Sequence, residues 1–185
     1  MSFTLRVATE ADLAAITMIY AESVLAGTAS YELRAPDEAE MAKRYAAIKG
    51  QGYPYIAAED RDGTLLGYAY ASAFRTRPAY RWLVEDSIYL APAARGRGIG
   101  RQLLDRLVDE CTTLGFRQMV AVIGGASAAS VALHRRCGFE LTGTLKGTGF
   151  KHGQWLDTVL MQRALGEGLT TDPDNTCYPG TLYDG

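Results

Sequence analysis

The stretch Ala-Arg-Gly-Arg-Gly-Ile-Gly at residues 94–100 places three glycines and two arginines between an apolar segment and an amphipathic one. Glycine permits positive φ values and lets a ligand approach the backbone closely. The first turn of a following helix would add unpaired N–H groups and partial positive charge. Arg95, Arg97 and Arg101 add formal charge around the same point. We therefore expect an anion-binding turn; the alternatives are a plain strand-to-helix turn and a basic spot for nucleic acid.

Two familiar phosphate-binding patterns do not fit this turn. The P-loop ends in Gly-Lys followed by Ser or Thr, whereas Gly100 is followed here by Arg101 and Gln102. The dinucleotide pattern G-x-G-x-x-G is also unmet, because Gly96 and Gly98 are followed by Gly100 one residue too early. The spacing thus indicates an anion-binding turn, but neither a P-loop nor a dinucleotide-binding turn.

Three titratable residues near this turn could move protons. Glu85 lies in the otherwise apolar stretch Trp-Leu-Val-Glu-Asp-Ser-Ile-Tyr-Leu, so burial should raise its pKa unless it is paired. Strand alternation sends Glu85 and Asp86 to opposite faces, so only one of them can point into a cleft; the other reading of Glu85 is a solvated strand-edge residue. His134, in a helical pattern, is either a packing residue or a proton donor near neutral pH.

The elements that must position these groups follow from hydrophobic periodicity and turn signals. Strands are predicted at 3–8, 53–60, 63–74, 84–92, 116–124, 139–150 and 154–165, and helices at about 10–26, 37–49, 99–114 and 127–137. Thr9 and Asp12 can cap the first helix, and Asp62-Gly63 is a strong hairpin signal. The order predicts the α/β (α+β) class, with a mixed central sheet of about seven strands flanked by about four helices.

Length and composition narrow the classes of function. The 185 residues suit one well-buried domain, and 19 Lys and Arg against 21 Asp and Glu give no global attraction for nucleic acid. The sequence has no apolar run long enough for a membrane span or a signal peptide. Cys111, Cys137 and Cys177 lack metal-binding or disulfide spacing, so we expect no metal and a reduced, cytoplasmic location.

The turn carries the pattern R-x-x-G-x-G at Arg95, Gly98 and Gly100. With this pattern the sequence resembles the GCN5-related N-acetyltransferases (GNAT), and the segments 84–100, 120–139 and 149–162 resemble the phosphinothricin and methionine sulfone/sulfoximine acetyltransferase branch. The resemblance covers about 1–165. It implies the GNAT fold, acetyl-CoA as co-substrate and a single domain over 1–165. Residues 166–185 are polar and rich in turn formers, so we expect a tail there, on which the resemblance gives no guidance.

The resemblance also implies roles for individual residues. The backbones of Ile88 and Leu90 are expected to bind the pantetheine arm. Expected to contact acetyl-CoA are Ile88, Tyr89, Leu90, Arg95, Gly96, Arg97, Gly98, Ile99, Gly100, Arg101, Ser127 and Ser130. Glu85 is the expected base, acting through water, and His134 or Tyr89 the expected proton donor to the thiolate. Ser127 stands where the branch has asparagine, but serine can still cap the helix.

The loop Phe-Arg-Thr-Arg-Pro-Ala-Tyr-Arg-Trp at 74–82 gathers arginines and aromatics just before Glu85. It could be a solvated basic loop or a nucleic-acid patch, but arginines beside a catalytic strand favour bidentate binding of a carboxylate or phosphinate. By resemblance, Arg75, Arg77, Tyr80 and Tyr31 bind the acceptor, and His152 could approach it. The acceptor expected is an α-amino acid with a tetrahedral, oxygen-bearing side chain.

Three hypotheses follow for the function. The first is N-acetylation of a small amino acid such as phosphinothricin, methionine sulfone or methionine sulfoximine. The second is acetylation of peptide or protein N-termini or of another small amine, which would need an open groove instead of an arginine-lined pocket. The third is a coenzyme A-binding module without catalysis. A homodimer is expected by resemblance only.

Overall fold

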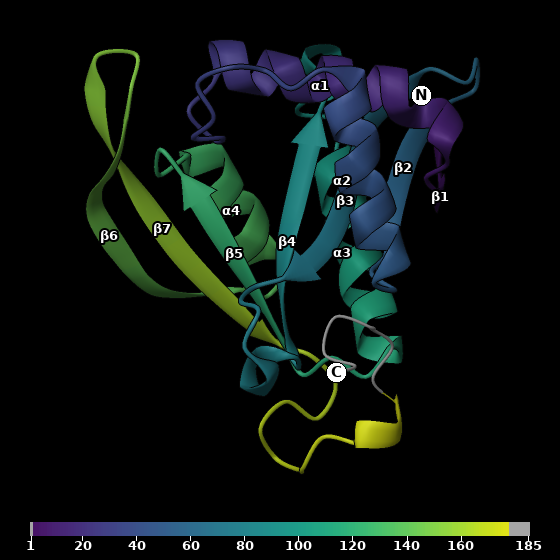
Figure 1. The fold of residues 1–185 in the computed structure, drawn as a ribbon, viewed down its shortest axis with the longest axis vertical. Coiled ribbons are helices and arrows are strands. Elements are labelled where there is room, and N and C mark those ends of the chain that lie inside the picture. Colours follow the sequence, from purple (N-terminus) through teal and green to yellow (C-terminus); the bar gives the residue numbers. More distant parts are fainter. Residues whose placement is uncertain (1, 178–185) are drawn as a thin grey trace.

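The computed structural model describes residues 2–177, which form one seven-stranded sheet with helices on its two faces (Figure 1). Within these residues the elements are β1 (Phe3–Val7), α1 (Leu13–Ala26), α2 (Glu38–Gly50), β2 (Tyr55–Asp60), β3 (Leu65–Ala73), β4 (Leu83–Leu90), α3 (Ile99–Thr113), β5 (Gln118–Gly124), α4 (Ala128–Arg136), β6 (Glu140–Lys151) and β7 (Gln154–Ala164). This order and number of strands and helices confirm the sequence prediction, with bounds within three residues for most elements.

The strand order across the sheet is β1-β2-β3-β4-β5-β7-β6. Every neighbouring pair is antiparallel except β4 and β5, which are parallel and connected through α3. This is the parallel crossover that the strand-helix-strand pattern predicts. Strands β6 and β7 pair along their length and extend away from the rest of the sheet as an arm, at the left of Figure 1.

Two apolar clusters hold the helices to the sheet, one on each face. Residues of α1 and α2 pack with Tyr55, Ala57 and Tyr68 on one face, and the apolar stripe of α3 packs with Ile56, Ala69 and neighbouring residues on the other. Alternation along β2 sends successive side chains to opposite faces, so a single strand supplies both clusters. The sheet is therefore covered on both faces from β2 to β4.

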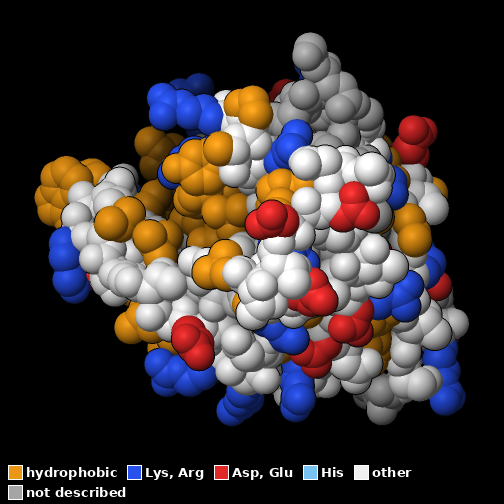
Figure 2. Space-filling model, turned by 90° about the horizontal axis from the view of Figure 1, so that it is seen from below, with side chains coloured by type: hydrophobic (Ala, Val, Ile, Leu, Met, Phe, Trp, Pro, Cys, Tyr) orange, Lys and Arg blue, Asp and Glu red, His pale blue; other side chains and the backbone are white. Residues whose placement is uncertain are grey.

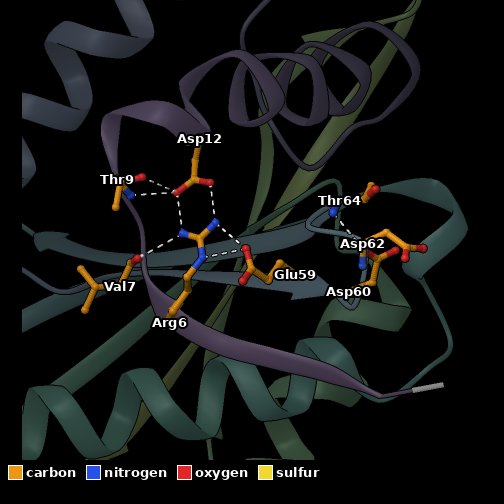
Figure 3. Close-up of polar contacts among 8 residues, drawn as sticks. All are labelled: Arg6, Val7, Thr9, Asp12, Glu59, Asp60, Asp62 and Thr64. Atoms are coloured by element: carbon orange, nitrogen blue, oxygen red, sulfur yellow. Dashed lines mark hydrogen bonds and ion pairs between the residues drawn. The ribbon is translucent and has the colours of Figure 1, made fainter.

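An ion network fixes the start of α1 against the edge of the sheet (Figure 3). Arg6 of β1 donates to both carboxylate oxygens of Asp12, at 2.7 and 2.8 Å, and to Glu59 of β2 at 2.7 Å. Asp12 also accepts from the backbone N–H of Thr9 at 2.8 Å, which completes the predicted capping box. The hydrogen bonds from Arg6 hold the pKa of the buried Asp12 carboxyl below its usual value.

The segment after β7 lies against the loop between β3 and β4. Arg117 contacts the carbonyl of Thr171 at 2.6 Å, and Arg81 donates to the side chain of Asn175. A hollow of about 280 Å³ between them is lined by Tyr80, Trp82 and Leu169, among others. The predicted tail at 166–185 thus contacts the body as far as Asn175, whereas residues 178–185 lie outside the described residues. The division into a domain and a tail stays a prediction.

Candidate active site

Strands β4 and β5 pair only at their beginnings. The parallel register covers residues 83–85 of β4 and 118–120 of β5, and its last pair is Glu85 with Val120. Beyond that pair, β4 continues along β3 and β5 continues along β7, so the two strands diverge (Figure 1). The divergence leaves one edge of β4 without a strand partner from residue 86 onward.

The free edge of β4 presents the backbone of two residues that the sequence singled out. The N–H of Ala91 donates to the carbonyl of Leu66 in β3 at 3.0 Å, so Ala91 faces β3. Because successive residues of a strand alternate, the backbone groups of Leu90 and Ile88 face the side from which β5 has diverged. The Leu90 carbonyl accepts there from Arg95 at 3.4 Å. An extended ligand arm can therefore hydrogen-bond to β4 as a further strand would.

The glycines of the turn at 94–100 serve two different purposes. Gly96 and Gly98 have φ values of +75° and +80°, which favour glycine, and a Cβ on either would meet nothing. At Gly100 a Cβ would lie 3.3 Å from the Leu90 side chain and 3.4 Å from that of Leu133. The first two glycines thus permit the turn, and the third lets α3 approach β4 and α4 closely.

The start of α3 has the features of an anion site. Gly98 is its N-cap and has no side chain to occupy the N–H groups of the first turn, and the first backbone bond of the helix runs from Gln102 to Gly98 at 3.3 Å. The positive charge around it is partly balanced, since Arg95 pairs with Glu22 of α1 at 2.6 Å and Arg101 with Asp105 at 3.4 Å. Arg97 lies on the exposed side of the turn. An anion at this turn would meet backbone N–H groups as well as arginine charge.

Glu85 lies where the two strands separate, and its surroundings fit a base. Its register partner in β3 is Ser72, so it shares the α1 face of the sheet with Tyr89. Burial, followed by the charge of Asp86, raises the pKa of Glu85 to about 7, while Arg75 acts in the opposite direction. This agrees with the expectation from its apolar sequence neighbours. A carboxyl group with this pKa is poised to accept a proton near neutral pH.

Tyr89 is packed among other tyrosines on the same face. Its ring lies 5.0 Å from that of Tyr20 in α1 and 5.3 Å from that of Tyr68 in β3. Burial raises the pKa of Tyr89 well above its ordinary value, so the phenol stays protonated at neutral pH. It can donate a proton only to a strong base close by.

His134 lies on the opposite face, where Asp86 holds it. The His134 Nε2 is 3.0 Å from an Asp86 carboxylate oxygen, and both side chains are 2% exposed. Its Nδ1 is 2.8 Å from the Ser130 carbonyl and 3.3 Å from the Ser130 hydroxyl. Both ring nitrogens are thus engaged inside the protein. Sequence reasoning considered Asp86 only as a competitor of Glu85; a second carboxylate in an apolar strand was the signal for a buried partner.

The N-terminus of α4 lies after the end of β5. Ser127 caps this helix by accepting from the Ser130 N–H at 3.4 Å, as predicted. Ala126, just before the cap, has a φ of +47°. Ser127 is therefore oriented by its own helix, directly after the end of β5.

The predicted acceptor residues are only partly brought together. Arg75 lies over the Phe74 ring at 4.1 Å, and its charge acts on Glu85. Arg77, just before the short 3₁₀ segment Pro78–Tyr80 of the same loop, and Tyr80 at its end are exposed. The Tyr80 ring lies 6.0 Å from that of Phe74. One arginine of the loop is therefore close enough to Glu85 to affect it.

Tyr31 is anchored at the far ends of β5 and β7. Its hydroxyl donates to the carbonyl of Asp157 at 2.9 Å, lies 2.8 Å from the Thr158 hydroxyl and accepts from the Gly125 N–H at 3.3 Å. His152 is exposed in the turn between β6 and β7, with a φ of +51°. Tyr31 is therefore fixed between β5 and β7, whereas His152 lies at the exposed tip of the β6–β7 arm.

Sequence reasoning missed Lys151, the last residue of β6. This lysine is buried and donates from Nζ to the Ser30 carbonyl at 2.7 Å, and burial lowers its pKa. The contact ties the arm to the loop that carries Tyr31. Its only sequence signal was its position next to His152.

Within residues 2–177, no helix is long and apolar enough to cross a membrane. The same part of the chain contains no group of three or more His, Cys, Asp or Glu side chains arranged to hold a metal ion.

Comparison with known proteins gives consistent results. A model of the acetyltransferase (GNAT) domain matches residues 5–160. A phosphinothricin N-acetyltransferase of Alcaligenes faecalis is 52% identical over 92% of this chain and 87% of its own length. An L-methionine sulfoximine/L-methionine sulfone acetyltransferase of Salmonella typhimurium is 40% identical over 91% and 98%. The crystal structure of a phosphinothricin acetyltransferase from Sinorhizobium meliloti in complex with AcCoA superposes with a TM-score of 0.96, at 64% identity and 99% coverage of both chains.

Proposed function

The chain belongs to the acetyltransferase (GNAT) family, and we propose that it transfers the acetyl group of acetyl-CoA to the α-amino group of a small amino acid. The acceptors that we propose are phosphinothricin, methionine sulfone and methionine sulfoximine, the compounds named for its relatives. The observation that carries the proposal is the position of Glu85, a carboxyl group with a pKa of about 7, at the point where β4 and β5 separate.

The donor fits the free edge of β4 and the start of α3. In this proposal the pyrophosphate binds the N–H groups around Gly98 and Gly100, with Arg97 and Arg101 beside it. The pantetheine arm hydrogen-bonds to the backbones of Ile88 and Leu90, and the α4 residues Ser127 and Ser130 line its other side. The acetyl group then lies near Glu85, where a backbone N–H of β4 can polarise the thioester carbonyl.

The acceptor would lie on the α1 face, above Glu85. Arg75 and Arg77 bind its acidic groups by paired hydrogen bonds, with Tyr80 beside them. Tyr31 and His152 line the side toward the arm.

The reaction follows from these positions. Glu85 takes a proton from the α-ammonium group through water, and the neutral amine attacks the thioester carbon. A C–N bond forms to give a tetrahedral intermediate, whose nitrogen loses its second proton to water. The C–S bond then breaks, and coenzyme A leaves as a thiolate that takes a proton from His134 or Tyr89. Direct attack needs donor and acceptor bound together, which is the arrangement that two adjoining binding regions favour.

The test is thiol release from acetyl-CoA with three matched acceptors: methionine sulfoximine, methionine and a peptide with a free N-terminus. We expect release with methionine sulfoximine and much less with methionine, which lacks the tetrahedral oxygens that the arginines bind. Release with the peptide alone would favour the N-terminal acetyltransferase. Binding of acetyl-CoA with no release for any amine would favour a non-catalytic module.

We also propose that the protein acts in the cytoplasm, where acetyl-CoA is available and free thiols such as Cys111 and Cys137 stay reduced.

We propose further that the protein is a homodimer. Figure 2 shows hydrophobic side chains gathered between the β6–β7 arm, at the left, and the rest of the molecule. Exposed apolar side chains on β5, β6 and β7 are Val122, Leu141, Leu145, Phe150 and Trp155. A second copy could cover them. Light scattering should give twice the mass of the chain. In Leu145→Glu the measured mass should fall toward that of a single chain.

A further inference from the structure

Asp86 and His134 form a pair in the interior of the protein, on the face of the sheet opposite Glu85. Asp86 comes from β4 and His134 from α4, and the 3.0 Å contact between them bridges the strand and the helix. The His134 and Phe139 rings pack edge to face, with their centroids 5.1 Å apart. The pair is buried, since both side chains are 2% exposed.

The hydrogen bonds fix how many protons the pair holds. A carbonyl oxygen only accepts, so the Nδ1 that lies 2.8 Å from the Ser130 carbonyl carries a proton. The contact between Nε2 and Asp86 holds one more, either as imidazolium with carboxylate or as imidazole with carboxylic acid. Although burial acts to lower it, the pKa of His134 is raised, because the hydrogen bond and charge of Asp86 outweigh burial. The charged form is therefore the favoured one.

Stability alone is a poor explanation for this pair. The second oxygen of Asp86, Oδ1, is buried and has no hydrogen-bond partner among the described residues. A buried carboxylate with one contact loses more hydration than it regains, and an apolar pair of similar size would commonly be at least as stable. The pair is better explained by what it does to the site.

Asp86 also lies next to the proposed base. It is the first residue of β4 beyond the last pair with β5, and its charge contributes to the raised pKa of Glu85. The other titratable group facing it is the buried thiol of Cys111 on α3, whose pKa is raised by burial first and then by Glu110 and Asp86. One carboxylate thus acts on the titratable groups of both faces of the strand.

We propose that Asp86 is a positioning residue, which holds His134 protonated and fixed beside the diverging strands and sets the charge that Glu85 experiences. The consequence for catalysis rests on the proposed function, but the pairing does not. Asp86 needs no contact with either substrate in this role. It links the proposed base on one face of the sheet to the proposed acid on the other.

The direct test is a nuclear magnetic resonance titration of His134. In the unmodified protein, imidazole nitrogen shifts should show both His134 nitrogens protonated to above its ordinary pKa of about 6.5. In Asp86→Asn, which keeps the shape, the pKa of His134 should fall by roughly one unit or more. Asp109→Asn, the same change on the exposed side of α3, should leave the pKa of His134 where it is.

The second readout is the pH dependence of kcat/KM for acetyl transfer. Loss of the Asp86 charge should lower the pKa of both Glu85 and His134, so both limbs of the profile should move to lower pH in Asp86→Asn. A His134 pKa at or below its ordinary value in the unmodified protein, or one unmoved in folded Asp86→Asn, would overturn the inference without any activity measurement. If the His134 titrations behave as expected but the protein transfers no acetyl group, the proposed function is contradicted and the pairing of Asp86 with His134 stands.

Discussion

Replacing Glu85 by glutamine removes a charge that the fold holds in an unfavourable place, so it should make the protein less active and, at alkaline pH, more stable. Burial and Asp86 raise the pKa of this carboxyl from 4.5 to about 7. At pH 4 the Glu85 carboxyl is mostly protonated in both the folded and the unfolded chain, so its ionisation does not change the free energy of unfolding. Between the pKa of 4.5 in the unfolded chain and about 7 in the folded protein, Glu85 is ionised mainly in the unfolded chain. The folded state therefore loses stability as the pH rises through this range, and above about pH 7 the loss is complete.

The size of this effect follows from the shift. A change of one pKa unit corresponds to about 1.4 kcal/mol, so the full shift corresponds to roughly 3 kcal/mol. Because Glu85 retains some contact with solvent, we expect about 2 kcal/mol at pH 8. For a chain of this length that raises the melting temperature of Glu85→Gln by roughly 4–8 °C. Loss of a general base should meanwhile lower kcat by about 10²- to 10⁴-fold.

The assay is thermal unfolding of both proteins at pH 4.5 and pH 8, followed by circular dichroism. Glutamine resembles the protonated carboxyl, so the two melting temperatures should agree at the lower pH and separate at the higher one. Glu140→Gln, the same change at an exposed position of β6, should show no such divergence. A Glu85→Gln protein without added stability at pH 8, or with unchanged activity and pH–rate profile, would refute the assignment of Glu85 as a buried base.

Three further changes test the donor turn, the acceptor loop and the ion network of Arg6. Gly98→Ala, at a φ of +80°, should cost about 1–2 kcal/mol of stability and weaken acetyl-CoA binding in calorimetry; equal affinity would contradict a role for this turn in donor binding. Arg75→Ala should raise the KM of the amino acid by about 10- to 100-fold with the KM of acetyl-CoA unchanged, and should raise the pKa of Glu85 further. Arg6→Ala should lower the free energy of unfolding at pH 7 by roughly 1–3 kcal/mol. Because the pKa of Asp12 is lowered in the folded state, that loss should shrink as the pH falls below 3.8, and a constant loss would argue against the ion pair.

Local features of the chain were predictable from the sequence because they depend on near neighbours. The apolar periodicity of α3, the capping residues Thr9 and Ser127 and the hairpin at Gly63 need only a few consecutive residues. The glycine-rich turn before α3 was predictable for the same reason, since strand, glycines and helix follow one another directly. The raised pKa of Glu85 required only that its strand be buried.

Contacts between distant segments were not predictable in this way. The pairing of Asp86 with His134 joins residues 48 positions apart, and that of Arg95 with Glu22 joins residues 73 apart. Each depends on how a helix docks on the sheet, which no local pattern encodes. The separation of β4 from β5 after Glu85 is likewise a property of the strand register, and it is what converts a glycine-rich turn and a carboxylate into one site.

The most direct measurement of the central claim is to identify the product formed from acetyl-CoA and methionine sulfoximine. We expect one N-acetyl group on the α-amino nitrogen, seen by nuclear magnetic resonance and mass spectrometry, with one free thiol released per product. Tight binding of acetyl-CoA without acetylated amino acid, or acetylation only of peptide N-termini, would contradict it.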